Sequence, residues 1–166
     1  SSFFGEPLLI ANTNDPPAGD LIITGSAIQG NSLSADTSTI TDPDGLGSFS
    51  YQWSSDGEII IGATSSSYIL TQNDVGKTVM LTASFTDGHG TTESLTSAAT
   101  APIANIDDST SASLSVSGIP QEGSALTAAL NDISDPDGTT STAFQWQLNS
   151  GSELNPAWAD ITSASS

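Results

Sequence analysis

The 166-residue sequence contains no cysteine and no arginine, and it has one lysine, one histidine and 19 acidic residues, for a formal net charge of -18. Without cysteine there is no disulfide, thiolate zinc site or cysteine nucleophile. Without a basic surface the chain is not expected to bind nucleic acid or an anionic membrane. The one histidine, His89, leaves the many hydroxyls without an activating base, so we predict no catalytic residue and no enzyme.

Long apolar runs are also missing. No stretch approaches the roughly 20 residues that a membrane span needs. The first ten residues lack the basic segment that opens a secretory signal peptide. We therefore expect no membrane insertion and see no signal peptide.

The sequence does contain an internal repeat. Three motifs recur with one offset of 93 positions. The pairs are Ile10–Asn12 with Ile103–Asn105, Asp42–Gly45 with Asp135–Gly138, and Tyr51–Trp53 with Phe144–Trp146. A constant offset over this span predicts a tandem repeat with a period of about 93 residues.

The period divides the chain into three parts. Residues 1–15 are expected to be the last strand of a preceding repeat and a linker, 16–108 one complete repeat, and 109–166 the N-terminal two-thirds of the next. The second copy lacks counterparts of residues 78–85, so we expect its core to lie open and a sheet edge to be unpaired.

The local patterns indicate an all-β fold. Residues 49–53 alternate aromatic and polar side chains, and 78–86 carry alternating apolar residues, as half-buried strands do. Turn signals recur about every ten residues, the spacing of a β-sandwich. Only Thr71–Val75 is expected to form a helical turn.

Several of these residues carry a family resemblance. Trp53, followed by Asp74–Gly76 and an alternating strand, resembles an immunoglobulin-like domain without its usual cysteines. The Tyr51–Trp53 and Thr86–Thr91 motifs resemble bacterial immunoglobulin-like repeats of large RTX-type, hemolysin-type calcium-binding surface or secreted adhesins. The Asn12–Pro17 linker is similar to those of cadherin-like repeats.

The resemblance implies tandem immunoglobulin-like (cadherin-like) β-sandwiches that extend or space other domains at the bacterial cell surface or in the extracellular medium. It also implies calcium at domain edges and junctions. We therefore expect a non-enzymatic structural module of an adhesin-like protein, with calcium as its cofactor and neighbouring repeats as its partners.

The residues themselves offer the oxygen ligands that calcium takes. The Asp42–Gly45 turn and its copy each place two carboxylates two positions apart, which favours either a metal loop or a plain β-turn. The two linkers hold further oxygen-bearing side chains. The cadherin-like resemblance implies that Asp87 and Glu122 are additional calcium ligands. The first repeat departs from this pattern, because Gln29 stands 93 positions before Glu122. The predicted metal ligands are Asn12, Asn14, Asp15, Asp42, Asp44, Asp87, Asn105, Asp107, Asp108, Glu122, Asp135 and Asp137.

Other functions stay open at this stage. Trp158, in an extended hairpin, either stacks on a sugar, which indicates a glycan- or surface-binding module, or packs on its own sheet. An orphan first strand and an open second core indicate a strand-donating subunit of a head-to-tail filament. Three Asp-Pro bonds, which are acid-labile, leave room for self-processing.

Overall fold

The computed structural model describes residues 10–138 and 141–162. Their secondary structure confirms the all-β prediction. The chain divides into two compact units, Ser1–Ile106 (unit 1) and Asp107–Ser166 (unit 2). Unit 1 contains β1 (Ile22–Thr24), β2 (Ser32–Asp36), β3 (Ser50–Ser55), β4 (Glu58–Ile59), β5 (Ser67–Ile69), the 3-10 turn η1 (Gln72–Asp74), β6 (Val79–Thr86) and β7 (Thr92–Thr96). Unit 2 contains β8 (Ser111–Gly118), β9 (Leu126–Ser134), β10 (Gln147–Asn149) and β11 (Trp158–Asp160).

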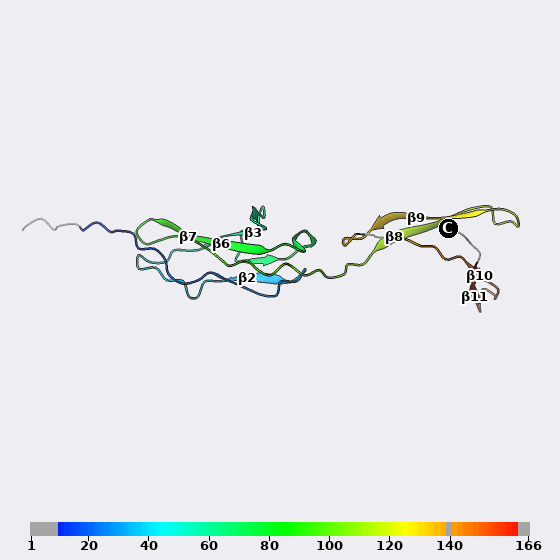
Figure 1. Cartoon of the computed structure of the whole chain (residues 1–166), viewed down its shortest axis with the longest axis horizontal. Helices are drawn as coiled ribbons and strands as arrows, with labels where there is room; N and C mark the ends of the chain where they lie inside the picture. The colour runs from blue at the N-terminus through cyan, green and yellow to red at the C-terminus, as the bar shows by residue number, and fades with distance from the viewer. Residues whose placement is uncertain (1–9, 139–140, 163–166) are drawn as a thin grey trace, which may run out of the picture. The chain divides into compact units, whose positions relative to one another are not determined.

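Unit 1 consists of two antiparallel sheets. Their strand orders are β1-β2-β5 and β4-β3-β6-β7. Figure 1 shows β2 on one side of the unit, facing β6 and β7. In the larger sheet Trp53 of β3 pairs with Leu81 of β6, so both side chains point to the same face, toward the smaller sheet.

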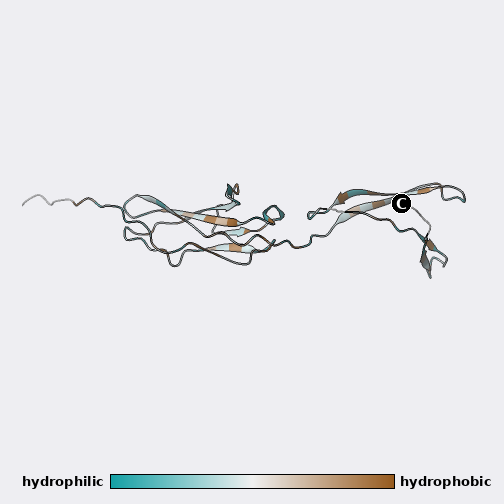
Figure 2. Cartoon of the chain, viewed as in Figure 1, coloured by the Kyte–Doolittle hydropathy of each residue, from teal (hydrophilic) through white to brown (hydrophobic). Residues whose placement is uncertain are grey.

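Trp53 lies at the centre of the core between the two sheets. Its side chain is fully buried, and its indole Nε1 donates a hydrogen bond of 2.8 Å to the carbonyl oxygen of Ser65. Burying roughly 200 Å² of indole corresponds to about 5 kcal/mol, an upper value because the unfolded chain already hides some surface. The buried residues of the cluster are Leu21, Leu33, Ile40, Trp53, Leu70, Val79, Leu81, Ala83 and Ile103. Figure 2 shows the apolar stretch that β6 contributes.

The chain crosses between the sheets at η1, within the stretch where the helical turn was expected. Asp74, which is 3% exposed, accepts hydrogen bonds of 2.8 Å from the Tyr68 hydroxyl and from both the backbone N–H and the hydroxyl of Thr71. Tyr68 stacks on Trp53 with ring centroids 5.9 Å apart. Partial burial raises the pKa of Tyr68 to about 12, and so do its hydrogen bond to Asp74 and the negative charge of that residue.

Unit 2 pairs β8 with β9 and β10 with β11. Its apolar residues are exposed where their counterparts in unit 1 are buried. Leu21 is 5% exposed but Leu114, 93 positions later, is 64% exposed, and Leu33 and Leu126 differ in the same way, at 1% and 44%. Figure 2 shows the apolar stretches of β8 and β9. In unit 1, Leu33 belongs to the same buried cluster as Val79, Leu81 and Ala83 of β6, whereas Leu114 and Leu126 stay exposed beside the described residues of unit 2.

The core of unit 1 can be tested with a matched pair of truncations. Leu33→Ala should destabilise unit 1 by about 2–5 kcal/mol because it leaves a cavity beside Trp53. Ile61→Ala, at a side chain that is 96% exposed, should change stability by less than about 0.5 kcal/mol. The measurement is urea unfolding followed by Trp53 fluorescence, in a background where Trp146→Phe and Trp158→Phe remove the other indoles. Equal effects of the two truncations would contradict the assigned core.

The contact between Tyr68 and Asp74 predicts a specific alkaline sensitivity. Because the folded-state pKa lies above the unfolded value of 10, the neutral phenol favours folding; its contribution is complete below pH 10 and is lost as the pH rises toward 12. The urea midpoint of wild type should therefore fall toward that of Tyr68→Phe over this range. A constant difference between the two proteins from pH 8 to 12 would contradict the prediction.

Candidate functional site

Three chain segments meet at one end of unit 1. They are the linker of residues 12–15, the loop of residues 42–45, and the turn that joins β6 to β7. We call this end the acidic pole, and its oxygen-bearing residues are Asn12, Asn14, Asp15, Asp42, Asp44, Asp87 and Glu93.

The Asp42–Gly45 loop is a β-turn, one of the two structures expected for it. The Gly45 N–H donates to the Asp42 carbonyl at 3.1 Å, and the Asp44 N–H donates to Asp42 Oδ1 at 2.7 Å. The loop is held against the β6–β7 turn because the Gly88 N–H donates to the Asp44 carbonyl at 3.0 Å. A Cβ at Gly88 would lie 2.6 Å from that oxygen, so this approach requires glycine.

The linker is tied to this pole through side chains. The Asn12 amide donates to Asp44 Oδ1 at 3.0 Å, and the Asp15 N–H donates to Asp44 Oδ2 at 2.8 Å. The Asn14 amide donates to Glu93 Oε1 at 2.7 Å. Asp44 therefore serves as an anchor for the linker, with both of its carboxylate oxygens accepting hydrogen bonds.

Asp87 is buried at the pole, with an exposed fraction of 6%. The alternation of β6 puts every second side chain from Val79 to Phe85 in the core, and Asp87 is the next inward position. Burial raises the pKa of Asp87, but the N–H groups of Thr91, His89 and Gly90 outweigh it and hold the pKa below its usual value. Oδ1 accepts the two strongest of these bonds, from His89 at 2.9 Å and Thr91 at 2.8 Å.

Glu93 interacts with the carboxylates of Asp42 and Asp87, and it was not among the predicted ligands. It pairs with Phe85 across β6 and β7, and it is half-buried. The Asn14 amide lowers the pKa of Glu93, but desolvation, the contact with Asp42 and repulsion from Asp42 and Asp87 together raise it. The position of Glu93 opposite the core residue Phe85 could have identified it as part of this cluster. That position is known only once the register of the β6–β7 hairpin is known.

Each of these three carboxylates keeps one buried oxygen that accepts no hydrogen bond. The atoms are Asp42 Oδ2, Asp87 Oδ2 and Glu93 Oε2. Among residues 10–138 and 141–162, however, no three His, Cys, Asp or Glu side chains are grouped as a ready metal centre. The pole therefore concentrates negative charge and spare oxygens without a preformed coordination shell.

The second loop repeats the geometry of the first. The Asp137 N–H donates to Asp135 Oδ1 at 3.0 Å, and the Asp108 N–H donates to Asp137 Oδ2 at 2.6 Å. The corresponding bonds in unit 1 lie 93 positions earlier, at Asp44 and Asp15. In addition, the Thr110 hydroxyl donates to Asp135 Oδ2.

Three predicted ligands lie away from these loops. Asn105 belongs to unit 1 and accepts a hydrogen bond of 3.5 Å from Gln72 of η1. Asp107 is exposed at the start of unit 2. Glu122 lies in the turn between β8 and β9, at the opposite end of that hairpin from Asp135.

The predicted ligand-binding residue, Trp158, is 60% exposed. It sits on β11 and pairs with Asn149 of β10. Leu154, in the loop between these strands, is 93% exposed. The hairpin thus presents apolar side chains to solvent.

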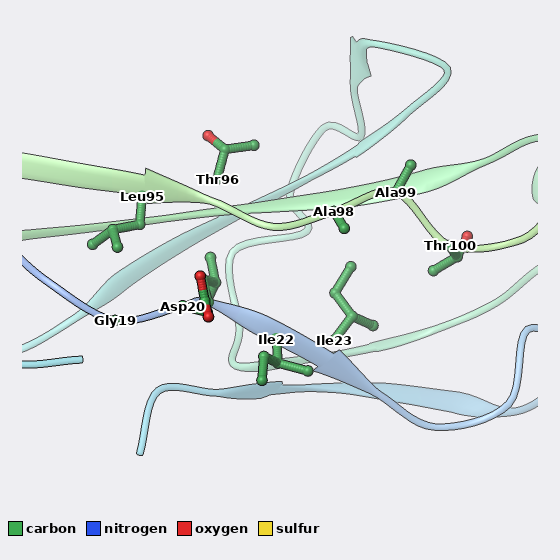
Figure 3. A pocket seen from close by; sticks show the side chains of 10 residues that line it. Gly19, Asp20, Ile22, Ile23, Leu95, Thr96, Ala98, Ala99 and Thr100 are labelled. Atoms are coloured by element: carbon green, nitrogen blue, oxygen red, sulfur yellow. The ribbon is translucent and has the colours of Figure 1, made fainter. Parts of the chain in front are cut away.

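A groove of about 380 Å³ runs along the seam of unit 1 between β1 and residues 95–100. Figure 3 shows Ile22 and Ile23 on β1, with Ala98 and Thr100 on the opposite segment. Asp20 is the one charged residue among those that line it. The groove lacks the converging polar groups that define a small-molecule site, and we assign it no function.

Comparisons with known proteins add no family: no family model, curated protein or solved structure matches the chain. Among the described residues, no helix is long and apolar enough to cross a membrane. The site must therefore be interpreted from its own chemistry.

The anchoring role of Asp44 can be tested by hydrogen exchange. Asp44→Ala removes both acceptors that hold the linker, and a hydrogen bond to a charged group contributes about 1.5–3 kcal/mol. We expect the Asp15 amide to exchange at least about tenfold faster than in wild type, measured by NMR. Asp20→Ala, an equal change of charge at an exposed position, is the control and should leave this rate unchanged.

Proposed function

We propose that the chain is a non-enzymatic spacer module: tandem immunoglobulin-like β-sandwiches of a large extracellular or cell-surface bacterial protein, stiffened by calcium at their loops and linkers. The observation that carries this proposal is the docking of the linker on the pole of unit 1, where Asp44 and Glu93 accept hydrogen bonds from three linker residues. A linker bound to its domain by side chains transmits orientation, which a freely jointed linker does not.

Strand order supports the immunoglobulin-like assignment. An immunoglobulin sandwich sets its first, second and fifth strands in one sheet against a sheet that carries the core tryptophan. The orders β1-β2-β5 and β4-β3-β6-β7, with Trp53 on β3, follow this plan. Ile103 also forms a parallel β-bridge with Val75, and Ala104 forms one with Ile28. These bridges join the last segment of unit 1 to the end opposite the acidic pole.

Recurring local geometry supports the 93-residue repeat. Gly25 and Gly118 have φ angles of 117° and 121°, and a Cβ at either would lie within 2.5 Å of a backbone oxygen. The Gln52 amide donates to the Trp53 carbonyl at 2.8 Å, and the Gln145 amide donates to the Trp146 carbonyl at 2.9 Å. Such shared details indicate that the two copies follow one backbone plan.

Charge supports calcium as the stiffening agent. The chain carries 19 acidic side chains and a single lysine, so its carboxylates cannot be neutralised by internal cations. A divalent cation at a pole relieves local repulsion and binds the folded state preferentially. Extracellular calcium modules typically bind in the 10⁻⁴–10⁻³ M range, which matches the setting that we propose.

A second candidate function is glycan or surface binding by the β10–β11 hairpin. The observation that favours it is the 60% exposure of Trp158, which leaves a ring face available for stacking on a sugar. Binding on a glycan array that Trp158→Ala abolishes would favour this function over the spacer.

A third candidate is strand donation in a head-to-tail filament. The exposed apolar face of β8 and β9, with Leu114 at 64% and Val116 at 56% exposure, favours it. A strictly monomeric chain in light scattering would exclude this function.

Calcium should stabilise the chain specifically. Saturation at 100 times the dissociation constant contributes about 2.7 kcal/mol, which raises the melting temperature of a domain of this size by roughly 10–20 °C. EDTA should reverse the rise and increase cleavage by protease. Potassium chloride at equal ionic strength is the control for screening. Melting that does not respond to calcium or EDTA would remove calcium from the proposed function and leave the fold assignment standing.

A further inference from the structure

The hairpin of β10 and β11 is an elaboration of a shorter hairpin in unit 1. Gln147 pairs with Asp160 in unit 2, and Ser54 pairs with Ile59 in unit 1. Gln147 and Ser54 are 93 positions apart, so the two pairs occupy the same place in the proposed repeat. Between the paired residues unit 1 has a tight turn, whereas unit 2 has residues 148–159. The insertion is therefore a feature of unit 2 alone.

The proposed repeat also indicates which face of this hairpin is turned to solvent. In β3 the side chains of Trp53 and Ser55 are buried, so Ser54 between them belongs to the outer face of its sheet. Its partner Ile59 is 66% exposed. The corresponding pair in unit 2 therefore lies on an outer face, which stays open to solvent when the core side of the sheet is covered.

Trp158 lies on the same outer face. Successive side chains of a strand alternate between its two faces, so residues two positions apart share one face. Trp158 is two positions from Asp160, and its partner Asn149 is two positions from Gln147. The indole, which is 60% exposed, therefore does not belong to the core side of the hairpin.

Hydrogen-bonding groups stand beside the indole on this face. The Gln147 amide donates to Asp160 Oδ1 at 2.9 Å, which fixes the two side chains against each other. Among the described residues, no donor reaches Asp160 Oδ2 or the side-chain carbonyl of Gln147, so both oxygens stay available as acceptors. Two strand positions span about 7 Å, so a ligand stacked on the Trp158 ring reaches this polar pair.

The loop that carries the ring is closed by its own hydrogen bonds. Asn149 Oδ1 accepts the N–H groups of Gly151 and Ala157, each at 2.9 Å. A Cβ at Gly151 would lie 2.2 Å from the Asn155 carbonyl oxygen, so this path of the loop requires glycine. Trp158 follows directly, and its backbone is positioned before a ligand arrives, which lowers the entropic cost of binding.

We propose that Trp158, Gln147 and Asp160 form a binding site for a neutral sugar, whose apolar face stacks on the indole and whose hydroxyls donate to the Gln147–Asp160 pair. This assignment rests on the second candidate function and names its ligand class and its polar contacts. The ring supplies apolar contact area, and the two acceptor oxygens fix the orientation of the sugar.

Charge selects neutral sugars over acidic ones. The site contains the Asp160 carboxylate, and the one lysine of the chain, Lys77, belongs to unit 1. A sialylated or sulfated sugar would place its negative charge beside Asp160 without a compensating cation, and like charges placed together disfavour binding. Cationic ligands are typically held in a cage of several aromatic rings, and β10 and β11 supply one.

Unit 1 does not reproduce this site. The apolar Ile59 stands in place of the acidic residue of the pair, and two positions before it stands Gly57 where unit 2 has Trp158. The neighbouring Asp56 instead accepts the N–H and hydroxyl of Thr78, which ties the turn to the start of β6. The sugar site therefore accompanies the inserted hairpin.

A glycan array tests the site with the labelled 166-residue chain. The probes are neutral hexose oligosaccharides printed beside sialylated and sulfated forms of the same oligosaccharides. We expect binding to the neutral probes only. Trp158→Ala should weaken it at least about tenfold and Trp158→Phe less, because phenylalanine keeps a smaller stacking face. Gln147→Ala should weaken it about 2- to 10-fold through the lost acceptor.

Leu154→Ala is the matched control. Leu154 is 93% exposed in the same loop, so its removal tests for unspecific apolar adhesion and should leave binding unchanged. All of these positions are exposed, and thermal melting should show that each variant folds as wild type does. Equal losses in Leu154→Ala and Trp158→Ala would overturn the assignment, as would preferred binding of the acidic probes. Gln147→Ala decides the question even if Trp158→Ala fails to fold.

The remaining outcomes separate this site from the functions on which it rests. If wild type binds neutral glycans and the binding survives in both Trp158→Ala and Gln147→Ala, the site is wrong and glycan binding stands. If wild type binds no glycan, the site and the second candidate function are both wrong, and the spacer function is unaffected.

Discussion

Neutralising carboxylates without cations is the constraint on which the rest of this structure depends. With one lysine against 19 acidic residues, the chain cannot pair most of its carboxylates with a cation, and several in unit 1 accept hydrogen bonds from N–H and O–H donors instead. Asp56 accepts the N–H and hydroxyl of Thr78, Asp74 accepts three donors at the sheet crossing, and Asp87 caps the turn after β6. Several turns of unit 1 therefore also supply the donors that satisfy a carboxylate. The same donors that satisfy a carboxylate hold the loop in shape.

At the acidic pole, N–H and O–H donors satisfy the carboxylates only in part. Asp42, Asp87 and Glu93 each keep one buried oxygen without a hydrogen bond, and at Glu93 the neighbouring carboxylates raise the pKa above its usual value. Ser55 Oγ and Gln72 Oε1 are also buried without a hydrogen bond, but at the pole three carboxylates share this property beside the linker. The linker therefore docks where hydrogen bonding to the carboxylates is incomplete, and violations of local satisfaction of this kind are often found at functional sites.

Much of the fold could be predicted from the sequence, because it depends on patterns that are local. The alternation of apolar and polar residues over 79–85 determines which face of β6 is buried. The sequence Asp-Pro-Asp-Gly at 42–45 favours a β-turn through its local conformational preferences alone. The site was harder to predict. Glu93 becomes a neighbour of Asp42 only through the register that sets it opposite Phe85, and register is a tertiary property. Glu122 was placed correctly near the start of a strand, because that position follows from the local pattern. Its distance from Asp135, at the other end of the β8–β9 hairpin, depends on the tertiary structure.

The chain is hydrogen-bonded to unit 1 both where it enters and where it leaves this unit. At the acidic pole the entering chain is held by Asp44 and Glu93. At the opposite end the leaving chain is also held: the Ala104 N–H donates to the Ala27 carbonyl at 2.9 Å, and the Ile106 N–H donates to the Gln29 side chain at 3.1 Å. These contacts on the leaving side use uncharged groups, whereas those on the entering side use carboxylates. A domain built in this way holds the leaving chain through groups that do not titrate, whereas its hold on the entering chain depends on the ionisation of Asp44 and Glu93.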